Sequence, residues 1–546
     1  MKQTRSQLSG ITVGAVVLLA GLLAACGSTK TEVSTGGAGD DKPVVATPGA
    51  ALASGAARNL HATQELKVRQ YFEPGGFDPA NLFRIETENI AFNLYSGLTT
   101  FDPDTGKPMP DLAESWTISP DGTVYRFSLV KNAEWHQGYG KVTAADVKYS
   151  YERVLDPKTG SPYRAELGDV SKIEAPDDYT VVITLKAPNL NFLYQVGNYH
   201  QGQIVKKEAI EKYGKDYPRN PVGTGPFYLE SWTANSEMVL RAHPGYFRGK
   251  ATLDKITLPL IKDIDPAATA LINGEVDLLS NLGAGTTELI DRVTATKGVT
   301  VHKAEGYAGL VWLYGPNFEP FQKKEVRQAM AYAVDEKTIA AKLTPRTAST
   351  WRSIIPGWMP PFQEGLKTYE YDPEKAKQLL AAAGYPNGFK VKWLNTDAKN
   401  EANLLRQSYW AKVGIQVEFE VVEPTVFNSR RNNGDFDLSL RLYPAVNPDT
   451  LLFGYLHPDN AAPKGLNSFK YNNPQVTSLL EKGRAAKTVE EQKAAYGEVQ
   501  KIIAEEVPYL AYGVSHQLWA GKSFVKNVKI NRLANVDFYP VYIEKH

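Results

Sequence analysis

The segments DPEKAKQLLAAAGYP (residues 372–386) and IQVEFEV (residues 415–421) decide the fold class. The first predicts a helix, because Asp372 can cap its start, Pro373 suits the first turn and Gly384 can end it. The second alternates apolar and polar side chains at a period of two, as a half-buried strand does. A helix followed by such a strand is typical of α/β layers, in which helices cover sheets.

Strand and helix signals alternate on both sides of this region. The β-branched run YTVVITL (residues 179–185) predicts another strand. The capping box TVEE (residues 488–491) opens a predicted helix that Pro508 closes. We therefore expect an α/β fold rather than an all-β sandwich.

The composition excludes several classes of protein. With 546 residues, of which 42% are hydrophobic and 22% charged, the chain can bury a large core, and we expect about three or four compact units. Its 61 Lys and Arg against 60 Asp and Glu leave a net charge of +1, which provides no long-range field for nucleic acid. A single Cys excludes an internal disulfide and a Cys-based metal cluster.

The N-terminus has the features of a secretory leader. Lys2 and Arg5 are basic, and a mostly apolar run follows at residues 11–25. That run is short for a membrane-spanning helix, which needs about 20 apolar residues, and suits a signal peptide. It ends in Leu-Ala-Ala directly before Cys26, which resembles the lipobox of bacterial lipoproteins. The resemblance implies removal of residues 1–25 and attachment of diacylglycerol to the Cys26 thiol.

Residues 26–63 predict a flexible tether. The stretch is rich in Gly, Ala, Ser and Thr and has almost no large apolar side chains, so it cannot bury enough surface to offset its chain entropy. No later run approaches the length of a membrane span. The lipid anchor is therefore the only membrane contact that we expect.

The chain lacks the short motifs of several enzyme classes. It contains neither an H-E-x-x-H metal-binding pattern nor a G-x-S-x-G nucleophile elbow. Its eight His residues are scattered along the chain. We therefore predict a protein without catalysis, resident metal or cofactor.

Several segments share one family pattern. In chain order they are YSGL (95–98), PDLAESW (110–116), SPDG (119–122), TAADVKYS (143–150), NPVGTGPF (220–227), NGEVD (273–277), VRQA (326–329) and YDPEKA (371–376). This pattern resembles the extracytoplasmic solute-binding proteins of peptide- and nickel-type ABC importers, family 5, and it spans about residues 65 to 546. Within that family, residues 155–163 and 542–546 resemble the oligopeptide-binding lipoproteins.

The resemblance implies an α/β, two-lobed periplasmic-binding-protein-like fold with hinge strands. The first lobe would hold residues 64–305, with an extra inserted subdomain at about 99–220. The second lobe would hold residues 306–508, and residues 509–546 would return to the first lobe. The implied function is a lipid-anchored receptor that captures oligopeptides in the cleft between its lobes.

The resemblance also implies partners and a location. The receptor would deliver its ligand to an ABC permease and its ATPase, and it would act as a monomer without nucleic acid. It would lie outside the cytoplasm, in the periplasm or on the outer face of the cell membrane. Closure of two lobes suits such transport, because closure couples ligand occupancy to a shape that a permease can recognise.

Two parts of the chain are expected to contact the ligand. Phe83, Arg84 and Ile85 match a region that pairs with extended peptide in relatives. The expected contacts from the second lobe are Arg431, Arg441, Tyr443 and Asp449. Of these, either Arg can meet a carboxylate.

One family feature is absent from this chain. In peptide-binding relatives an Asp after the second-lobe strand pairs with the α-ammonium of the ligand, but the aligned position here holds Val446 or Pro444. Neither residue can pair with an amine, and a buried unpaired ammonium is costly. Asp449 is close enough to substitute, although it matches a different family residue. The ligand is thus a peptide held by its backbone, a peptide with a blocked amine, or a non-peptide such as an oligosaccharide.

Two functions of other classes stay open on the sequence alone. A secreted hydrolase on a tether would share the leader and the globular body. A surface receptor or chaperone without an importer would share them as well.

Overall fold

The computed structural model describes residues 59–546 apart from 83–84, 344–345, 351–352, 360 and 445–446. The predicted leader and its lipidation residue Cys26 lie outside the described residues. So do Phe83, Arg84 and the aligned position Val446.

The end of the predicted tether, residues 59–63, lies against the C-terminus. The backbone N–H of His61 donates to the carbonyl of Ile543 at 2.9 Å. The side-chain amide of Gln64 donates to the same carbonyl at 2.9 Å and accepts from the Ile543 N–H at 2.9 Å. The C-terminal segment therefore returns to the start of the globular body.

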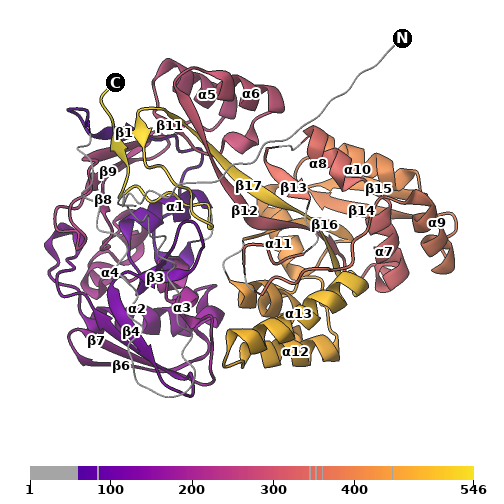
Figure 1. The fold of residues 1–546 in the computed structure, drawn as a ribbon, viewed down its shortest axis with the longest axis horizontal. Helices are drawn as coiled ribbons and strands as arrows, with labels where there is room; N and C mark the ends of the chain where they lie inside the picture. Colours follow the sequence, from indigo (N-terminus) through magenta and orange to yellow (C-terminus); the bar gives the residue numbers. More distant parts are fainter. Residues whose placement is uncertain (1–58, 83–84, 344–345, 351–352, 360, 445–446) are drawn as a thin grey trace, which may run out of the picture. The chain divides into compact units, whose positions relative to one another are not determined.

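The first lobe contains two four-stranded sheets (Figure 1). One has the strand order β1 (Glu65–Lys67), β10 (Lys255–Pro259), β9 (Glu237–Ala242), β8 (Phe227–Thr233). In this sheet β1 is parallel to β10, and the other neighbouring strands are antiparallel. The other is antiparallel and has the order β4 (Ala113–Ile118), β5 (Val124–Leu129), β7 (Thr180–Leu185), β6 (Val170–Asp177). This second sheet falls within the predicted inserted subdomain.

Helices and short strand pairs complete the first lobe. The helices are α1 (Ile85–Leu94), α2 (Ala144–Leu155), α3 (Phe192–Gln195), α4 (Lys207–Tyr213), α5 (Ile264–Asn273) and α6 (Thr287–Ala295). The short pairs are β2 (Thr99–Phe101) with β3 (Pro108–Pro110), and β18 (Val525–Lys526) with β19 (Tyr542–Ile543). Phe127, Trp135 and Tyr151 are buried in one core that joins both sheets.

Two long antiparallel strands run from the first lobe into the second, β12 (Val299–Tyr314) and β17 (Tyr509–Lys522). At the end in the first lobe, β17 also pairs with β11 (Leu278–Leu279). At the end in the second lobe, β12 also pairs with β16 (Leu438–Pro444). These two strands therefore connect the lobes as hinge strands, which confirms the two-lobed α/β fold that the sequence predicts.

The pairing of the hinge strands breaks where they pass between the lobes. Their register is irregular between Ala304 and Ala308. Gly306, inside this interval, has a φ of +63°, which favours glycine. Its N–H donates to His516 Nδ1 at 3.1 Å, and its carbonyl accepts from the indole N–H of Trp358 at 3.2 Å. The backbone can bend at such a break while most of the ladder stays intact.

The second lobe is one sheet with helices on both faces (Figure 1). Beyond β12 and β16, its strands are β14 (Phe389–Asn395) and β15 (Ile415–Val421), and β13 (Ala348–Thr350) pairs with β17. One face packs on α7 (Lys324–Tyr332), α8 (Glu336–Leu343), α9 (Pro373–Ala382) and α10 (Glu401–Ala411). The other packs on α11 (Pro424–Asn433), α12 (Pro474–Arg484) and α13 (Val489–Glu506).

Several local predictions are confirmed. Strand β15 has the predicted bounds, and α9 follows Asp372, whose side chain accepts from the backbone N–H of Lys375. Helix α13 begins at the predicted capping box, in which Thr488 and Glu491 satisfy one another's backbone N–H groups. Capping signals of this kind act within one helical turn, so the helix start that they predict does not depend on how distant parts of the chain pack.

Candidate ligand site at the lobe interface

Strand β16 and helix α11 bring three of the predicted contacts together. Arg441 and Tyr443 are two residues apart on β16, so both point to the same face of the sheet. That face carries Val311, the cross-strand partner of Arg441, and it is covered by Phe427 of α11. Because Arg431 lies one turn after Phe427, its side chain reaches the same region.

Two aromatic rings lie beside the Arg441 guanidinium. Its central carbon lies 5.5 Å from the ring centres of both Tyr443 and Tyr455, and these two rings lie 3.9 Å apart. The guanidinium of Arg431 lies 4.9 Å from the ring of Phe427. Such contacts hold a cation by its flat faces and leave its N–H groups free to donate.

Buried donors of this cluster have no acceptor among the described residues. They are Nε of Arg431, Nη1 of Arg441 and the hydroxyl of Tyr443. Among the described residues, the Arg431 guanidinium donates from Nη2 to Asn428 Oδ1 at 2.8 Å. A buried donor without a partner costs about 1–3 kcal/mol, and more when it is charged. The arrangement would be satisfied by an acidic group that accepts from all three.

The two guanidinium groups also oppose one another electrostatically. Burial, and next the positive charge of Arg441, lower the pKa of Arg431 to about 10. The Arg431 guanidinium nevertheless remains a cation at neutral pH. A carboxylate placed between them would relieve their repulsion and supply the missing acceptors.

Asp449, the remaining predicted contact of the second lobe, is already paired. Its carboxylate accepts from Nε of Arg484 at 3.1 Å and from Nη2 at 2.6 Å. It also accepts from the hydroxyl of Tyr496 at 2.8 Å, and it is almost fully buried. An ammonium group would have to compete with the Arg484 guanidinium for this carboxylate.

Of the predicted first-lobe segment, the structure describes only the backbone of Ile85, which begins helix α1. One turn later, Glu88 Oε1 lies 2.7 Å from His200 Nε2, and Glu88 Oε2 accepts from the Tyr199 hydroxyl at 2.8 Å. The Tyr163 ring stacks on His200 with the ring centres 4.2 Å apart. This cluster was not predicted, since its members come from three separate segments and no local sequence pattern links them.

A polar contact joins the two lobes beside this site. The hydroxyl of Thr450, in the π-helical turn η9 (Thr450–Gly454), donates to Glu166 Oε2 at 3.4 Å. Glu166 lies in the 3₁₀ turn η4 (Arg164–Leu167) of the first lobe. The two residues are 284 positions apart in the chain, so no sequence signal could have paired them.

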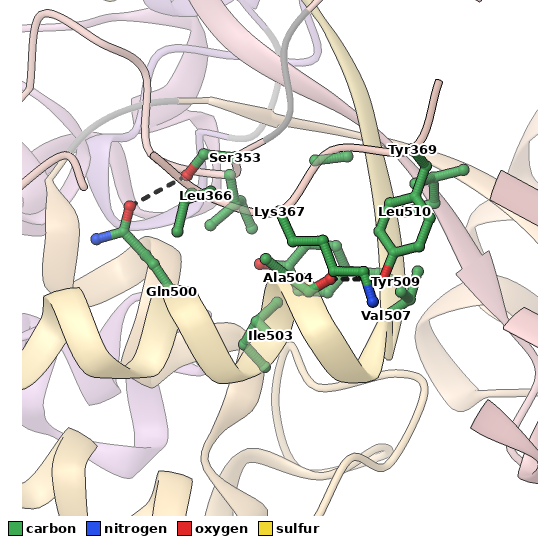
Figure 2. A pocket seen from close by; sticks show the side chains of 12 residues that line it. Ser353, Leu366, Lys367, Tyr369, Gln500, Ile503, Ala504, Val507, Tyr509 and Leu510 are labelled. Carbon is green, nitrogen blue, oxygen red and sulfur yellow. Dashed lines mark hydrogen bonds between the residues drawn. The ribbon is translucent and has the colours of Figure 1, made fainter. Parts of the chain in front are cut away.

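Two cavities in the second lobe are separate from the arginine cluster. One of about 30 Å³ lies between α13 and the segment that contains Ser353 and Tyr369 (Figure 2). Its polar groups already have partners: Ser353 Oγ donates to Gln500 Oε1 at 3.2 Å, and the Tyr369 hydroxyl donates to the Ala504 carbonyl at 2.8 Å. That volume suits a water molecule rather than a solute.

The larger cavity, of about 180 Å³, lies on the opposite face of the sheet from Arg441. Leu310 and Leu440 line it from the strands, and Glu336 and Arg406 line it from α8 and α10. Glu336 and Arg406 are bonded to one another there. Within the residues that the structure describes, no group of three or more His, Cys, Asp or Glu could hold a metal ion, and no helix is long and apolar enough to cross a membrane.

Comparisons with known proteins point to one family. The model of the bacterial extracellular solute-binding proteins, family 5 (middle), matches residues 107–463. Among curated relatives, heme-binding protein A of Haemophilus influenzae is 28% identical over 470 residues, which cover 80% of this chain and 84% of that protein.

Solved structures agree with the sequence matches. One match is the ABC transporter-associated periplasmic binding protein DppA from Helicobacter pylori, solved in complex with peptide STSA. It is 29% identical to this chain, with a TM-score of 0.79. The match covers 88% of this chain and 98% of that one. The binding protein MoaA from A. tumefaciens R10, in complex with mannopinic acid, is 27% identical, also with a TM-score of 0.79, over 89% of this chain and 100% of that one. These matches confirm the two-lobed binding-protein fold and are to binding proteins rather than enzymes.

Proposed function

The chain belongs to the bacterial extracellular solute-binding proteins of family 5, and from that premise we propose that it captures a solute with a carboxylate group between its two lobes and delivers it to an ABC permease. The chain is thus an extracytoplasmic substrate-binding protein rather than an enzyme. The ligand that we favour is a short peptide held by its C-terminal carboxylate. Transport would use the permease and its ATPase, with the receptor acting as a monomer.

The observation that supports this proposal most directly is the set of buried donors on Arg431, Arg441 and Tyr443 that have no acceptor among the described residues. Buried donors of this kind are expected where a ligand supplies their acceptors. A peptide and an organic acid are the ligands in the two solved structures above, and both classes of compound carry a carboxylate. This shared chemistry supports an anchor point for a carboxylate in this chain as well.

The α-ammonium of such a peptide has no counterpart at Asp449, because Arg484 and Tyr496 occupy that carboxylate. We therefore expect recognition to depend on the carboxyl end of the peptide and not on its amino end. A neutral oligosaccharide is the competing ligand class, and it would leave both guanidinium charges unpaired.

For the two lobes we propose the boundaries that the sequence predicts. Residues 64–305 with the return at 509–546 would form the first lobe, and residues 306–508 the second. The first lobe has hydrophobic cores of its own, and the two faces of the second-lobe sheet pack on two other cores, which supports this division.

A ligand panel tests the proposal. The protein would be heated with tri- to pentapeptides, with the same peptides N-acetylated or C-terminally amidated, and with maltotriose. A ligand at 100 times its Kd stabilises the folded state by about 2.7 kcal/mol, which raises the unfolding midpoint. We expect free and N-acetylated peptides to raise it and amidated peptides to fail. A shift with maltotriose alone, or equal shifts with acid and amide, would contradict the proposal.

We further propose that Cys26 carries a lipid anchor. The basic, apolar and Leu-Ala-Ala-Cys order of the leader supports this, and two or more acyl chains would anchor the protein stably. In a bacterial host grown with labelled palmitate, the natural chain should be labelled and sediment with membranes, whereas Cys26→Ser should be neither labelled nor sedimented. Labelling that survives the substitution would exclude Cys26 as the anchor.

A further inference from the structure

Several buried or half-buried arginines of this chain have their acceptors within the protein. Arg406 pairs with Glu336, and Arg484 pairs with Asp449. Arg69 donates to three backbone carbonyls instead. A guanidinium taken out of water therefore receives either a counter-charge or a set of carbonyl oxygens at these positions.

Arg431 and Arg441 receive neither. Each keeps a buried N–H group without an acceptor among the described residues, and neither forms an ion pair with a carboxylate there. The amide oxygen of Asn428 accepts from Arg431, but this oxygen is neutral and balances no charge. The cluster on α11 and β16 thus carries two positive charges that the described part of the chain leaves unbalanced.

The carboxylates near the cluster have other partners. Asp449 pairs with Arg484, as described above. On α11 the neighbouring Arg430 pairs with two carboxylates of its own. Glu166 faces the cluster from the first lobe and accepts from the Thr450 hydroxyl rather than from either arginine. Both negative charges that the cluster lacks must therefore come from the ligand.

The two guanidinium groups offer separate binding positions. That of Arg431 lies against the Phe427 ring, whereas that of Arg441 lies against the rings of Tyr443 and Tyr455. One carboxylate can accept from donors of both groups, but it balances only one of the two charges. Two carboxylates joined by a short carbon chain would place an acidic group at each guanidinium.

We propose that the preferred ligand ends in two carboxylates, as a peptide does whose last residue is aspartate or glutamate. Its α-carboxylate binds Arg441 and Tyr443, and its side-chain carboxylate binds Arg431. This inference rests on the proposed function, because it takes the carboxyl end of a peptide to be captured at this cluster. Arg431 then selects the acidic side chain, since a partly desolvated guanidinium without a counter-charge is costly.

Matched tripeptides measure this selection. Isothermal titration would compare Ala-Ala-Glu with Ala-Ala-Gln, which has nearly the same shape but no charge on its last side chain. We expect the natural protein to bind Ala-Ala-Glu about 10- to 100-fold more tightly, in line with a hydrogen bond between charged groups. Glu-Ala-Ala carries the same net charge with the acidic side chain at the other end, and it should bind no more tightly than Ala-Ala-Ala.

Variants of two neighbouring arginines make the result specific to Arg431. In Arg431→Gln the preference for Ala-Ala-Glu over Ala-Ala-Gln should fall to about threefold or less. Arg431→Lys keeps the positive charge and should retain part of the preference. Arg430→Gln removes an arginine that is already paired, so the preference should equal that of the natural protein. Thermal unfolding without ligand checks that each variant is folded.

The outcomes separate this inference from the proposed function. Equal affinities of the natural protein for Ala-Ala-Glu and Ala-Ala-Gln would overturn the inference and leave carboxylate capture standing. So would a full preference that persists in Arg431→Gln. Equal binding of Ala-Ala-Ala and its C-terminal amide would contradict the proposed function, and failure of every peptide to bind would contradict both.

Discussion

Replacing Arg441 with alanine is expected to weaken the binding of a carboxylate ligand by about 2–4 kcal/mol, or roughly 30- to 1,000-fold. The guanidinium lies against two tyrosine rings and has a buried Nη1 without an acceptor among the described residues. A ligand carboxylate would meet that donor in a partly desolvated site, where a charge-assisted hydrogen bond is strongest. Isothermal titration of the variant with the peptide that shifts the natural protein measures the loss.

In the absence of ligand, the same substitution should not lower the stability of the fold. Because Arg441 and Arg431 repel one another and each has a buried N–H group without an acceptor among the described residues, Arg441→Ala should leave the unfolding midpoint unchanged or raise it. A residue that merely supports the fold would lower the midpoint instead. The combination of lost affinity and retained stability therefore identifies a ligand contact.

Helix α11 offers a matched control one residue away from Arg431. Arg430 is bonded to Glu420 at 2.7 Å and to Asp435 at 2.8 Å, so its charge is already neutralised within the protein. Arg430→Ala should leave ligand affinity within about a factor of two or three. If Arg430→Ala and Arg441→Ala weakened binding equally, the loss would reflect net charge and not a carboxylate site.

Local signals in the sequence predicted secondary structure well, since each acts over a few residues. The strand at 415–421, the helix after Asp372 and the capping box at 488–491 all appear as predicted. Glycines show the limit of such signals. Gly223 lies in the family pattern, but only the fold shows why: a Cβ there would lie 2.0 Å from the carbonyl oxygen of Leu94.

The candidate site was predicted in part, for a physical reason. Arg441 and Tyr443 share a strand face, and period-two alternation in the sequence is enough to place them together. Asp449 could be recognised as an acid near the expected position, but its ion pair with Arg484 depends on how α12 packs and is not visible in the sequence. Glu166 carries no local signal, because its importance comes from a contact between the lobes, and Tyr455 matters only through its packing on Tyr443 and Arg441 of β16.

The largest expected effect on stability concerns a buried ion pair in the second lobe. Arg406 on α10 donates to both carboxylate oxygens of Glu336 on α8, from Nε at 2.9 Å and from Nη2 at 2.8 Å. The Arg406 guanidinium also lies 4.7 Å from the ring centre of Tyr512 on hinge strand β17. The pair thus ties two helices to the strand that joins the lobes.

Arg406→Met should destabilise the protein by about 3–5 kcal/mol, because it leaves the Glu336 carboxylate buried without a counter-charge. Adding Glu336→Leu should recover most of that loss, since two apolar side chains of similar size remove the stranded charge. Urea denaturation of both variants, followed by tryptophan fluorescence, measures the difference. The exposed pair Lys337–Glu370 is the control, and Lys337→Met should cost at most about 1 kcal/mol.

The double variant decides what the ion pair contributes. If stability returns but ligand-induced closure is lost, the pair serves the geometry of the hinge and not the stability of the lobe. If neither stability nor closure returns, the volume and packing around Tyr512 matter more than the charges. Recovery of both would show that the fold needs a neutral, well-packed contact at this point, and that charge is one of two ways to obtain it.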